Sequence, residues 1–229
     1  TTCDFINNTA NKGGAVATNL FSVNYQNLGN VYRGWEINTC EFTNNKASEN
    51  GGALYLPWTT GLKINNLPFI NNTAALYGGG SFLTNTTADP TNNNTKYELC
   101  TFINNTAGAS GAIYWSGDDL LISGGQFINN KATATDAGAI YIGVGTGAAT
   151  AHSVVDGVYF ENNSAYSNGG AISGTASNVN ITNNQFITNN AWYGGAVYWG
   201  DGASNINIGN DQFTGNKANG GGAVDIYGS

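Results

Sequence analysis

The chain has 229 residues, of which 41% are hydrophobic, 9% are charged and 33 are glycine, and its formal net charge is −7. This negative charge, with only seven Lys and Arg residues, excludes a surface that binds nucleic acid. No apolar run reaches the roughly 18 residues that a membrane-spanning helix needs. Although disordered chains are also rich in Gly, the apolar residues here recur at fixed places, which favours ordered β structure.

A motif Phe-x-x-Asn-x-Ala occurs eight times along the chain, and a Gly-Ala or Gly-Ser step follows each copy. A unit repeated over the whole length indicates a solenoid, in which each unit contacts mainly its neighbours. The phenylalanines are Phe5, Phe42, Phe69, Phe102, Phe127, Phe160, Phe186 and Phe213. The asparagines are Asn8, Asn45, Asn72, Asn105, Asn130, Asn163, Asn189 and Asn216. The glycines of the second step are Gly14, Gly52, Gly80, Gly111, Gly138, Gly170, Gly195 and Gly222.

Each copy predicts three short strands, in a fixed order. An apolar pair seven and five residues before Phe, such as Leu62 and Ile64, alternates with polar residues and marks the first strand. The second strand surrounds the Phe, and the third follows the Gly-Ala step, as in Gly-Ala-Val-Tyr at 195–198. A helix is not supported, because Asn, Gly and Thr dominate. Residues 1–229 therefore predict one all-β domain, a parallel β-helix of about eight three-strand coils. Since the chain starts at Thr1 inside a repeat, we expect it to be a section of a longer protein.

Equivalent strands of successive coils should pair, so that like residues stack on like. The Phe side chains are then expected to fill the core as a column. Each Asn is expected at a left-handed turn, with its amide bonded to the Asn of the next coil. The apolar residues that follow the Gly-Ala step are expected to fill the core from another wall: Val16, Leu54, Phe82, Ile113, Ile140, Ile172, Val197 and Val224.

Three cysteines, Cys3, Cys40 and Cys100, each precede a repeat Phe by two residues, which directs them inward. Leu67 and Val158 occupy the same slot in other copies, which favours small buried hydrophobic residues. A Cys3–Cys40 disulfide is also geometrically possible between adjacent coils. Equivalent slots on a straight ladder do not converge on a point, so we expect no metal and no cofactor.

Aromatic residues offer a candidate binding stripe on the third strand. If the residue before each one points inward, Tyr55, Tyr114, Tyr141 and Tyr198 line the outside, where they could contact sugar rings or a partner protein. For Trp115 and Trp199 we favour inward-facing positions at the corners of the coil. Trp58 and Trp192 lie near the same strand or its flanking turns.

Three insertions follow the Gly-Ala strand, at approximately 20–33, 84–96 and 143–152, and should leave the rod along one edge. Insertions on one face of a solenoid often form its binding face, although surface loops are also simply tolerated. Asn85 and Asn93 lie in the second insertion within Asn-x-Thr sequons and are candidate glycosylation sites.

The sequence contains no grouping of basic, acidic and nucleophilic residues that is typical of a catalytic site. A lyase needs Lys or Arg as base, whereas the chain has one Arg and scattered Lys. A hydrolase needs carboxylates roughly 5–9.5 Å apart, but Asp118 and Asp119 point to opposite sides if extended. These aspartates could also hold calcium, but solvated turns are the favoured interpretation. The only histidine, His152, falls in an insertion. We expect no enzyme activity.

The two motifs, Phe-x-x-Asn and Gly-Gly-Ala followed by Ile, Leu or Val, resemble the repeats of the polymorphic outer membrane proteins of chlamydiae. The form Phe-Ile-Asn-Asn-Thr-Ala is still more similar to repeats in adhesin-like surface proteins of methanogenic archaea. The resemblance covers residues 5–224. It implies a right-handed parallel β-helix in a secreted adhesin or surface protein.

The leading prediction is a non-catalytic extracellular rod that binds glycans or proteins of a host or neighbouring cell through one face. The alternative is a self-assembling filament subunit whose coils stack end to end, because uncapped β-helix ends expose unpaired backbone groups. A polysaccharide-active β-helix enzyme is a third and less favoured function.

Overall fold

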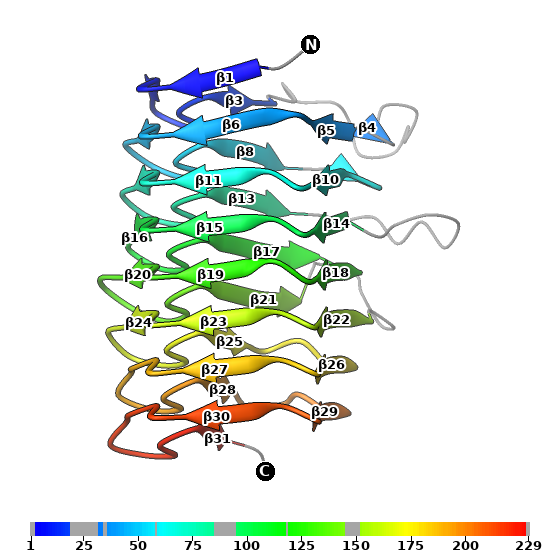
Figure 1. The fold of residues 1–229 in the computed structure, drawn as a ribbon, viewed down its shortest axis with the longest axis vertical. Coiled ribbons are helices and arrows are strands. Elements are labelled where there is room, and N and C mark those ends of the chain that lie inside the picture. Colours follow the sequence, from blue (N-terminus) through cyan, green and yellow to red (C-terminus); the bar gives the residue numbers. More distant parts are fainter. Residues whose placement is uncertain are drawn as a thin grey trace.

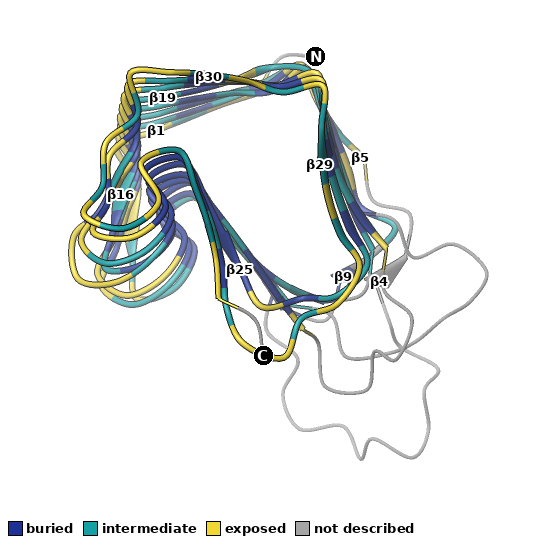
Figure 2. Cartoon of the chain, turned by 90° about the horizontal axis from the view of Figure 1, so that it is seen from below, coloured by how far each residue is buried: buried dark blue, intermediate teal, exposed yellow. Residues whose placement is uncertain are grey.

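The structure, a computed structural model, describes residues 3–18, 32–33, 36–57, 59–84, 95–117, 119–144 and 152–227. These residues form parallel strands that stack coil upon coil, with the two termini at opposite ends of the stack (Figure 1). Seen from the C-terminal end, the chain turns anticlockwise as it approaches the viewer, so the helix is right-handed (Figure 2). The predicted parallel β-helix is confirmed.

The Phe sheet contains the strand of the repeat phenylalanine from all eight coils, in sequence order. Its register pairs Phe5 with Phe42, Phe42 with Phe69, and so on through the stack. The strands are β1 (Cys3–Ile6), β6 (Cys40–Thr43), β11 (Pro68–Ile70), β15 (Thr101–Ile103), β19 (Gln126–Ile128), β23 (Tyr159–Glu161), β27 (Gln185–Ile187) and β30 (Gln212–Thr214).

The Gly-Ala sheet is the wall that follows the glycine step, again with eight strands. They are β3 (Val16–Ala17), β8 (Leu54–Pro57), β13 (Ser81–Thr84), β17 (Ile113–Gly117), β21 (Ile140–Val144), β25 (Ile172–Gly174), β28 (Val197–Trp199) and β31 (Val224–Ile226). The apolar-pair sheet closes the cross-section with β5 (Glu36–Asn38), β10 (Lys63–Asn65), β14 (Thr95–Glu98), β18 (Leu120–Ser123), β22 (Ser153–Asp156), β26 (Val179–Thr182) and β29 (Ile206–Gly209).

Most coils have a fourth, very short strand, whereas the sequence predicts three strands per coil. This strand lies at the corner between the Phe sheet and the Gly-Ala sheet. It includes the Ala of the Phe-x-x-Asn-x-Ala motif: β2 (Thr9–Ala10), β7 (Lys46–Ala47), β12 (Thr73–Ala74), β16 (Thr106–Ala107), β20 (Lys131–Ala132) and β24 (Ser164–Ala165). The loops after these strands project as a ridge along the stack (Figure 2). One further pair, β4 (Tyr32–Arg33) with β9 (Thr59–Thr60), lies outside these four sheets.

The phenylalanines form the predicted column at the centre of the stack. Their rings are parallel within 20°, and consecutive centroids lie 4.5 to 5.1 Å apart. The six interior rings are fully buried. Trp115 and Trp199 are also fully buried, as predicted, and Trp199 Nε1 donates to the carbonyl of Ala176 at 2.8 Å. Phe5 and Phe213, in the terminal coils, are partly exposed.

The asparagines form a second column beside the rings, as predicted. Asn72 Nδ2 donates to Asn105 Oδ1 at 3.0 Å, and the backbone N–H of Asn72 donates to the same oxygen at 3.0 Å. Nδ2 also donates to the carbonyl of Phe42 at 2.8 Å, in the preceding coil. The six interior members, from Asn45 to Asn189, are fully buried. Each buried amide is therefore satisfied by the coils above and below it.

The residue before each ladder asparagine adopts the left-handed backbone conformation. The prediction that the ladder asparagine itself adopts it is wrong. Positive φ of 52 to 57° occurs at Asn7, Asn44, Asn71, Asn104, Asn129, Asn162 and Thr188, and Gly215 follows at 65°. The preceding residue makes the turn, which leaves the ladder amide free to point inward. Asn tolerates this region better than other non-Gly residues do.

The two consecutive glycines of the Gly-Gly-Ala motif are required for different reasons. The first glycine has positive φ, for example 67° at Gly51. At the second there is no room for a side chain, because a Cβ on Gly52 would lie 2.0 Å from the carbonyl oxygen of Gly79. The backbones of neighbouring coils are therefore in direct contact here.

The third coil departs from the predicted core. Gly79 takes the place of Gly52, since a Cβ on Gly79 would lie 2.2 Å from the carbonyl oxygen of Gly111. Ser81 is therefore the buried residue, and Phe82 faces outward. The prediction that Gly80 forms the step and Phe82 fills the core is wrong by one residue. The space left by the small serine is shared with buried Tyr97, whose hydroxyl lies 2.8 Å from Ser81 Oγ. Burial raises the pKa of Tyr97, because the phenolate would lose its hydration.

Of the three cysteines predicted to be buried, only Cys100 is, whereas Cys40 is partly exposed and Cys3, in the first coil, is exposed. Cys3 and Cys40 are register partners, and both carry free thiols in this structure. Cys100 is buried, and burial raises the pKa of its thiol to about 11. Burial and the neighbouring Cys3 thiol raise the pKa of Cys40. The thiols of Cys40 and Cys100 are therefore protonated at neutral pH.

Candidate functional site

Three of the four predicted tyrosines meet on the outer face of the Gly-Ala sheet. Tyr55, Phe82, Tyr114 and Tyr141, which we call the aromatic row, are consecutive register partners on β8, β13, β17 and β21. Their ring centroids lie 5.0 to 5.2 Å apart, and neighbouring rings are parallel within 13°. Their neighbours in sequence, such as Leu54, Leu56 and Trp115, point into the core.

The aromatic row presents ring edges rather than ring faces, because each interior ring is covered by the next. Tyr77 from the ridge leans on Tyr114 at a centroid distance of 4.9 Å. Burial raises the pKa of Tyr114 to about 12, since its phenolate would be poorly hydrated. Lys12 Nζ lies 5.4 Å from the Tyr55 ring centre and 3.4 Å from Glu49 Oε2, so the row ends in a cation.

Tyr198 is not part of this row. Its register partner in the preceding coil is Ser173, which in turn pairs with Tyr141. A buried serine therefore separates Tyr198 from the stacked rings. Burial and the neighbouring Asp225 raise the pKa of Tyr198.

The predicted insertions fall largely outside the described residues, as do Asn85, Asn93, Trp58 and Asp118. The strands that precede the insertions, β3, β13 and β21, all belong to the Gly-Ala sheet. Asp119 accepts a hydrogen bond at 2.8 Å from the backbone N–H of His152. In the described ranges, no three His, Cys, Asp or Glu side chains gather in a way that could hold a metal ion. A helix that could cross a membrane is likewise absent from these ranges.

A second group of aromatic residues lies on the ridge, and of these only Trp192 was noted from the sequence, without its neighbours. Tyr166, Trp192 and Tyr193 are 72%, 56% and 45% exposed. The signal was present, because Tyr166 and Trp192 directly follow the Ala of their motif, where other copies have a smaller residue such as Asn11 or Ser48. Core residues repeat in every coil, whereas these aromatic residues occur in only two.

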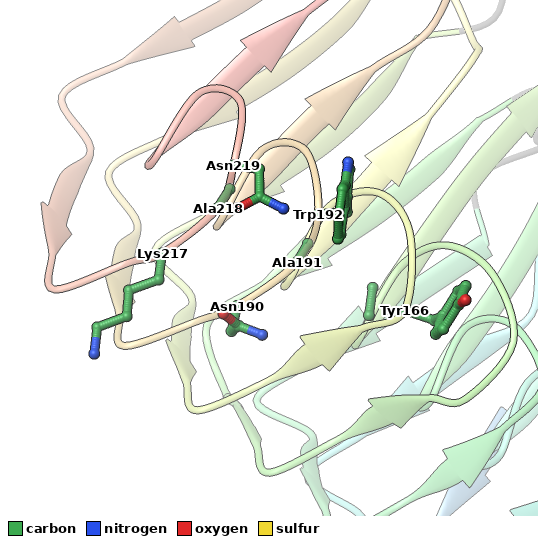
Figure 3. A pocket seen from close by; sticks show the side chains of 8 residues that line it. Tyr166, Asn190, Ala191, Trp192, Lys217, Ala218 and Asn219 are labelled. Atoms are coloured by element: carbon green, nitrogen blue, oxygen red, sulfur yellow. The ribbon is translucent and has the colours of Figure 1, made fainter.

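A hollow of about 300 Å³ lies beside these rings (Figure 3). It crosses the last three coils at the ridge. Its lining combines two aromatic side chains, three alanines, two asparagines and a lysine: Tyr166, Trp192, Ala165, Ala191, Ala218, Asn190, Asn219 and Lys217.

These stacked walls, with an aromatic row outside and ladders inside, define a parallel β-helix repeat protein. Residues 39–57 and 157–175 match the family model of the Chlamydia polymorphic membrane protein repeat. Each segment begins before a repeat Phe and ends after the Gly-Gly-Ala step of the same copy. Two segments of the chain are thus similar to the polymorphic membrane protein repeat. No curated protein and no solved structure was found to match it.

Proposed function

We propose that the chain is a non-catalytic adhesive rod of a cell-surface protein, which binds a partner through the outer face of the Gly-Ala sheet. The observation that carries this proposal is the aromatic row. The four rings are partly exposed, and a contiguous aromatic surface is typical of binding sites, because it provides a large contact area. A surface location is supported by the family match, since the matched repeat is named for a membrane protein.

The absence of catalysis in this proposal is supported by the geometry of the repeats. Each residue type recurs along a straight column, so equivalent side chains run parallel to the axis. An active site needs different groups that converge on one reacting atom. The aromatic row instead offers ring edges at a regular spacing, with hydroxyls on its three tyrosines, which suits an extended partner such as a protein surface or a polymeric glycan.

The test is adhesion of the purified chain, coupled to beads, to cultured epithelial cells, microbial cells and a printed glycan array. Tyr114→Ser with Tyr141→Ser should reduce binding about tenfold or more, because two adjacent rings lose their contact area. Tyr159→Ser is the matched control, because this outward tyrosine lies on the Phe sheet. Circular dichroism establishes that the variants are folded. Unchanged adhesion of the double variant, or no adhesion by the native chain, would contradict the proposal.

A self-assembling filament is the second candidate. The first and last described coils carry the same ladder residues as the interior, with Phe5 and Asn8 at one end and Phe213 and Asn216 at the other. Either end could accept another coil, from a continuation of the chain or from a second copy. Electron micrographs of purified native material that show long uniform fibres would favour the second copy. Monodisperse short rods that bind cells would favour the adhesin.

A further inference from the structure

We propose that the hollow beside Trp192 is a separate binding site for a neutral pyranose ring of a glycan. This site lies on the ridge and does not include the aromatic row, so it stands apart from the binding face proposed above. Its residues come from neighbouring coils near the C-terminal end of the described chain (Figure 3).

The ring faces are the first reason. A pyranose presents a face of C–H groups that packs on an aromatic ring, and such packing needs an uncovered ring face. Rings in the aromatic row cover one another at 5.0 to 5.2 Å. Tyr166 and Trp192 make no such ring contact within the described part of the chain, and 72% and 56% of their surfaces are exposed. The ridge therefore offers the uncovered faces that the row lacks.

Unpaired amides are the second reason. Asn190 and Asn219 line the hollow, and within the described residues their side chains make no hydrogen bond. The buried ladder asparagines differ, because their amides are fully paired. A free side-chain amide offers two donors and an acceptor, which match the hydroxyls of a sugar. Ala165, Ala191 and Ala218 leave space for the ring between these groups.

The polar lining that a ligand beside Trp192 would meet is uncharged. No carboxylate lines the hollow, and its one cation is Lys217. The Lys217 side chain extends away from both aromatic rings (Figure 3). A ligand seated against Trp192 therefore meets amides and ring faces rather than an ammonium group, so an acidic sugar gains little here.

The loops that carry these side chains are held in place before any ligand binds. Trp192 N–H donates to the carbonyl of Ser167 at 2.8 Å, and Asn219 N–H donates to the carbonyl of Trp192 at 2.9 Å. Tyr166 N–H donates to the carbonyl of Ala132 at 3.2 Å. These backbone hydrogen bonds link the ridge loops of successive coils. Because the loops are already ordered, ligand binding loses little conformational entropy.

The experiment uses the quenching of tryptophan fluorescence by acrylamide. Trp115 and Trp199 are fully buried, so Trp192 is the accessible tryptophan among the described residues. The probes are four neutral oligosaccharides, cellotetraose, chitotetraose, mannotetraose and galactotetraose, with affinities measured by titration calorimetry. At least one should bind and protect Trp192 from acrylamide. Trp192→Ala should weaken that binding about tenfold or more, and Trp192→Phe should keep most of it.

Two control variants separate this site from other surfaces. Leu76→Ala removes an exposed apolar residue of the ridge outside the hollow, and should bind as the native chain does. Tyr114→Ser with Tyr141→Ser should also bind the oligosaccharide unchanged, whatever its effect on adhesion. The proposal is overturned if none of the four probes binds at 10 mM (on the order of the weakest specific affinities) or if Trp192→Ala binds normally. It is also overturned if sialyllactose binds more tightly than all four and Lys217→Ala abolishes that binding.

Discussion

The side-chain amide of Asn105 and its own backbone N–H both donate to one atom, Asn130 Oδ1, at 3.0 and 3.1 Å. Asn130 in turn donates from Nδ2 to the carbonyl of Phe102 at 2.9 Å and to Asn163 Oδ1 at 3.0 Å. One side chain thus joins three coils, and it also fixes the corner at which the Phe strand ends.

Replacement of Asn130 by Ala should lower the free energy of unfolding by about 3 kcal/mol or more, because several buried groups lose a partner at roughly 1–3 kcal/mol each. Urea denaturation followed by circular dichroism measures the change. Asn207→Ala is the control, since Asn207 donates to Asn180 at 3.2 Å in an exposed pair. Its effect should be within about 0.5 kcal/mol. Equal effects of the two variants would contradict the importance of the buried ladder.

Replacement of Gly138 by Ala should prevent folding or strongly destabilise the stack. The added Cβ would lie 1.9 Å from the carbonyl oxygen of Gly170 and 2.6 Å from the backbone nitrogen of Ser164, and backbone atoms cannot move aside without separating the coils. Gly157→Asn is the matched control, because a Cβ there meets nothing within 4 Å and φ is 66°. The yield of folded protein and its melting temperature measure both. A folded Gly138→Ala variant with native stability would show that the coils do not approach this closely.

Replacement of Thr188 by Asn should stabilise the protein by about 0.5–1 kcal/mol. Thr188 has φ of 52°, where β-branched residues are strained, while six equivalent positions have Asn. The melting temperature and urea midpoint should both rise. A fall in either would mean that the Thr188 side chain stabilises the native state in a way that its backbone conformation does not reveal.

Asp211 should make the stability depend on pH. Its Oδ1 accepts from Asn184 N–H and Nδ2 at 2.7 and 3.0 Å, whereas its buried Oδ2 has no partner within the described residues. Burial raises the pKa of Asp211 above 3.8, and nearby Asp156 adds to the rise. The neutral carboxyl is therefore favoured in the folded state. Stability should be highest below the unfolded pKa and fall as pH rises through the folded pKa.

Asp211→Asn should remove this fall and raise stability at pH 7. Asn184 occupies the equivalent slot one coil earlier, and its Nδ2 donates to the carbonyl of Val155 at 3.0 Å. Asn at 211 supplies the same donor toward Ile181, the register partner of Val155. Urea denaturation between pH 3 and pH 8 (on either side of an ordinary carboxyl pKa of about 4) compares the two proteins. Parallel stability curves would contradict the role of Asp211.

Sequence alone determined the columns. Phe102 stacks on Phe127, and Asn105 bonds Asn130, because every coil carries the same residue at the same place. Stacking of like on like follows once one coil repeats, so the coil path and the inward-facing side of each strand could be predicted without coordinates. Even the outward direction of Tyr114 follows from the alternation along a strand.

Tertiary structure decided where single coils differ from the average. Phe82 lies outside because backbone contact between Gly79 and Gly111 fixes the register of the third coil, which three consecutive glycines leave open in the sequence. The exposure of Trp192 depends on the loops above and below it rather than on its own motif. A repeat pattern specifies what all coils share, and only the packing between neighbouring coils decides which of the remaining side chains reach the surface.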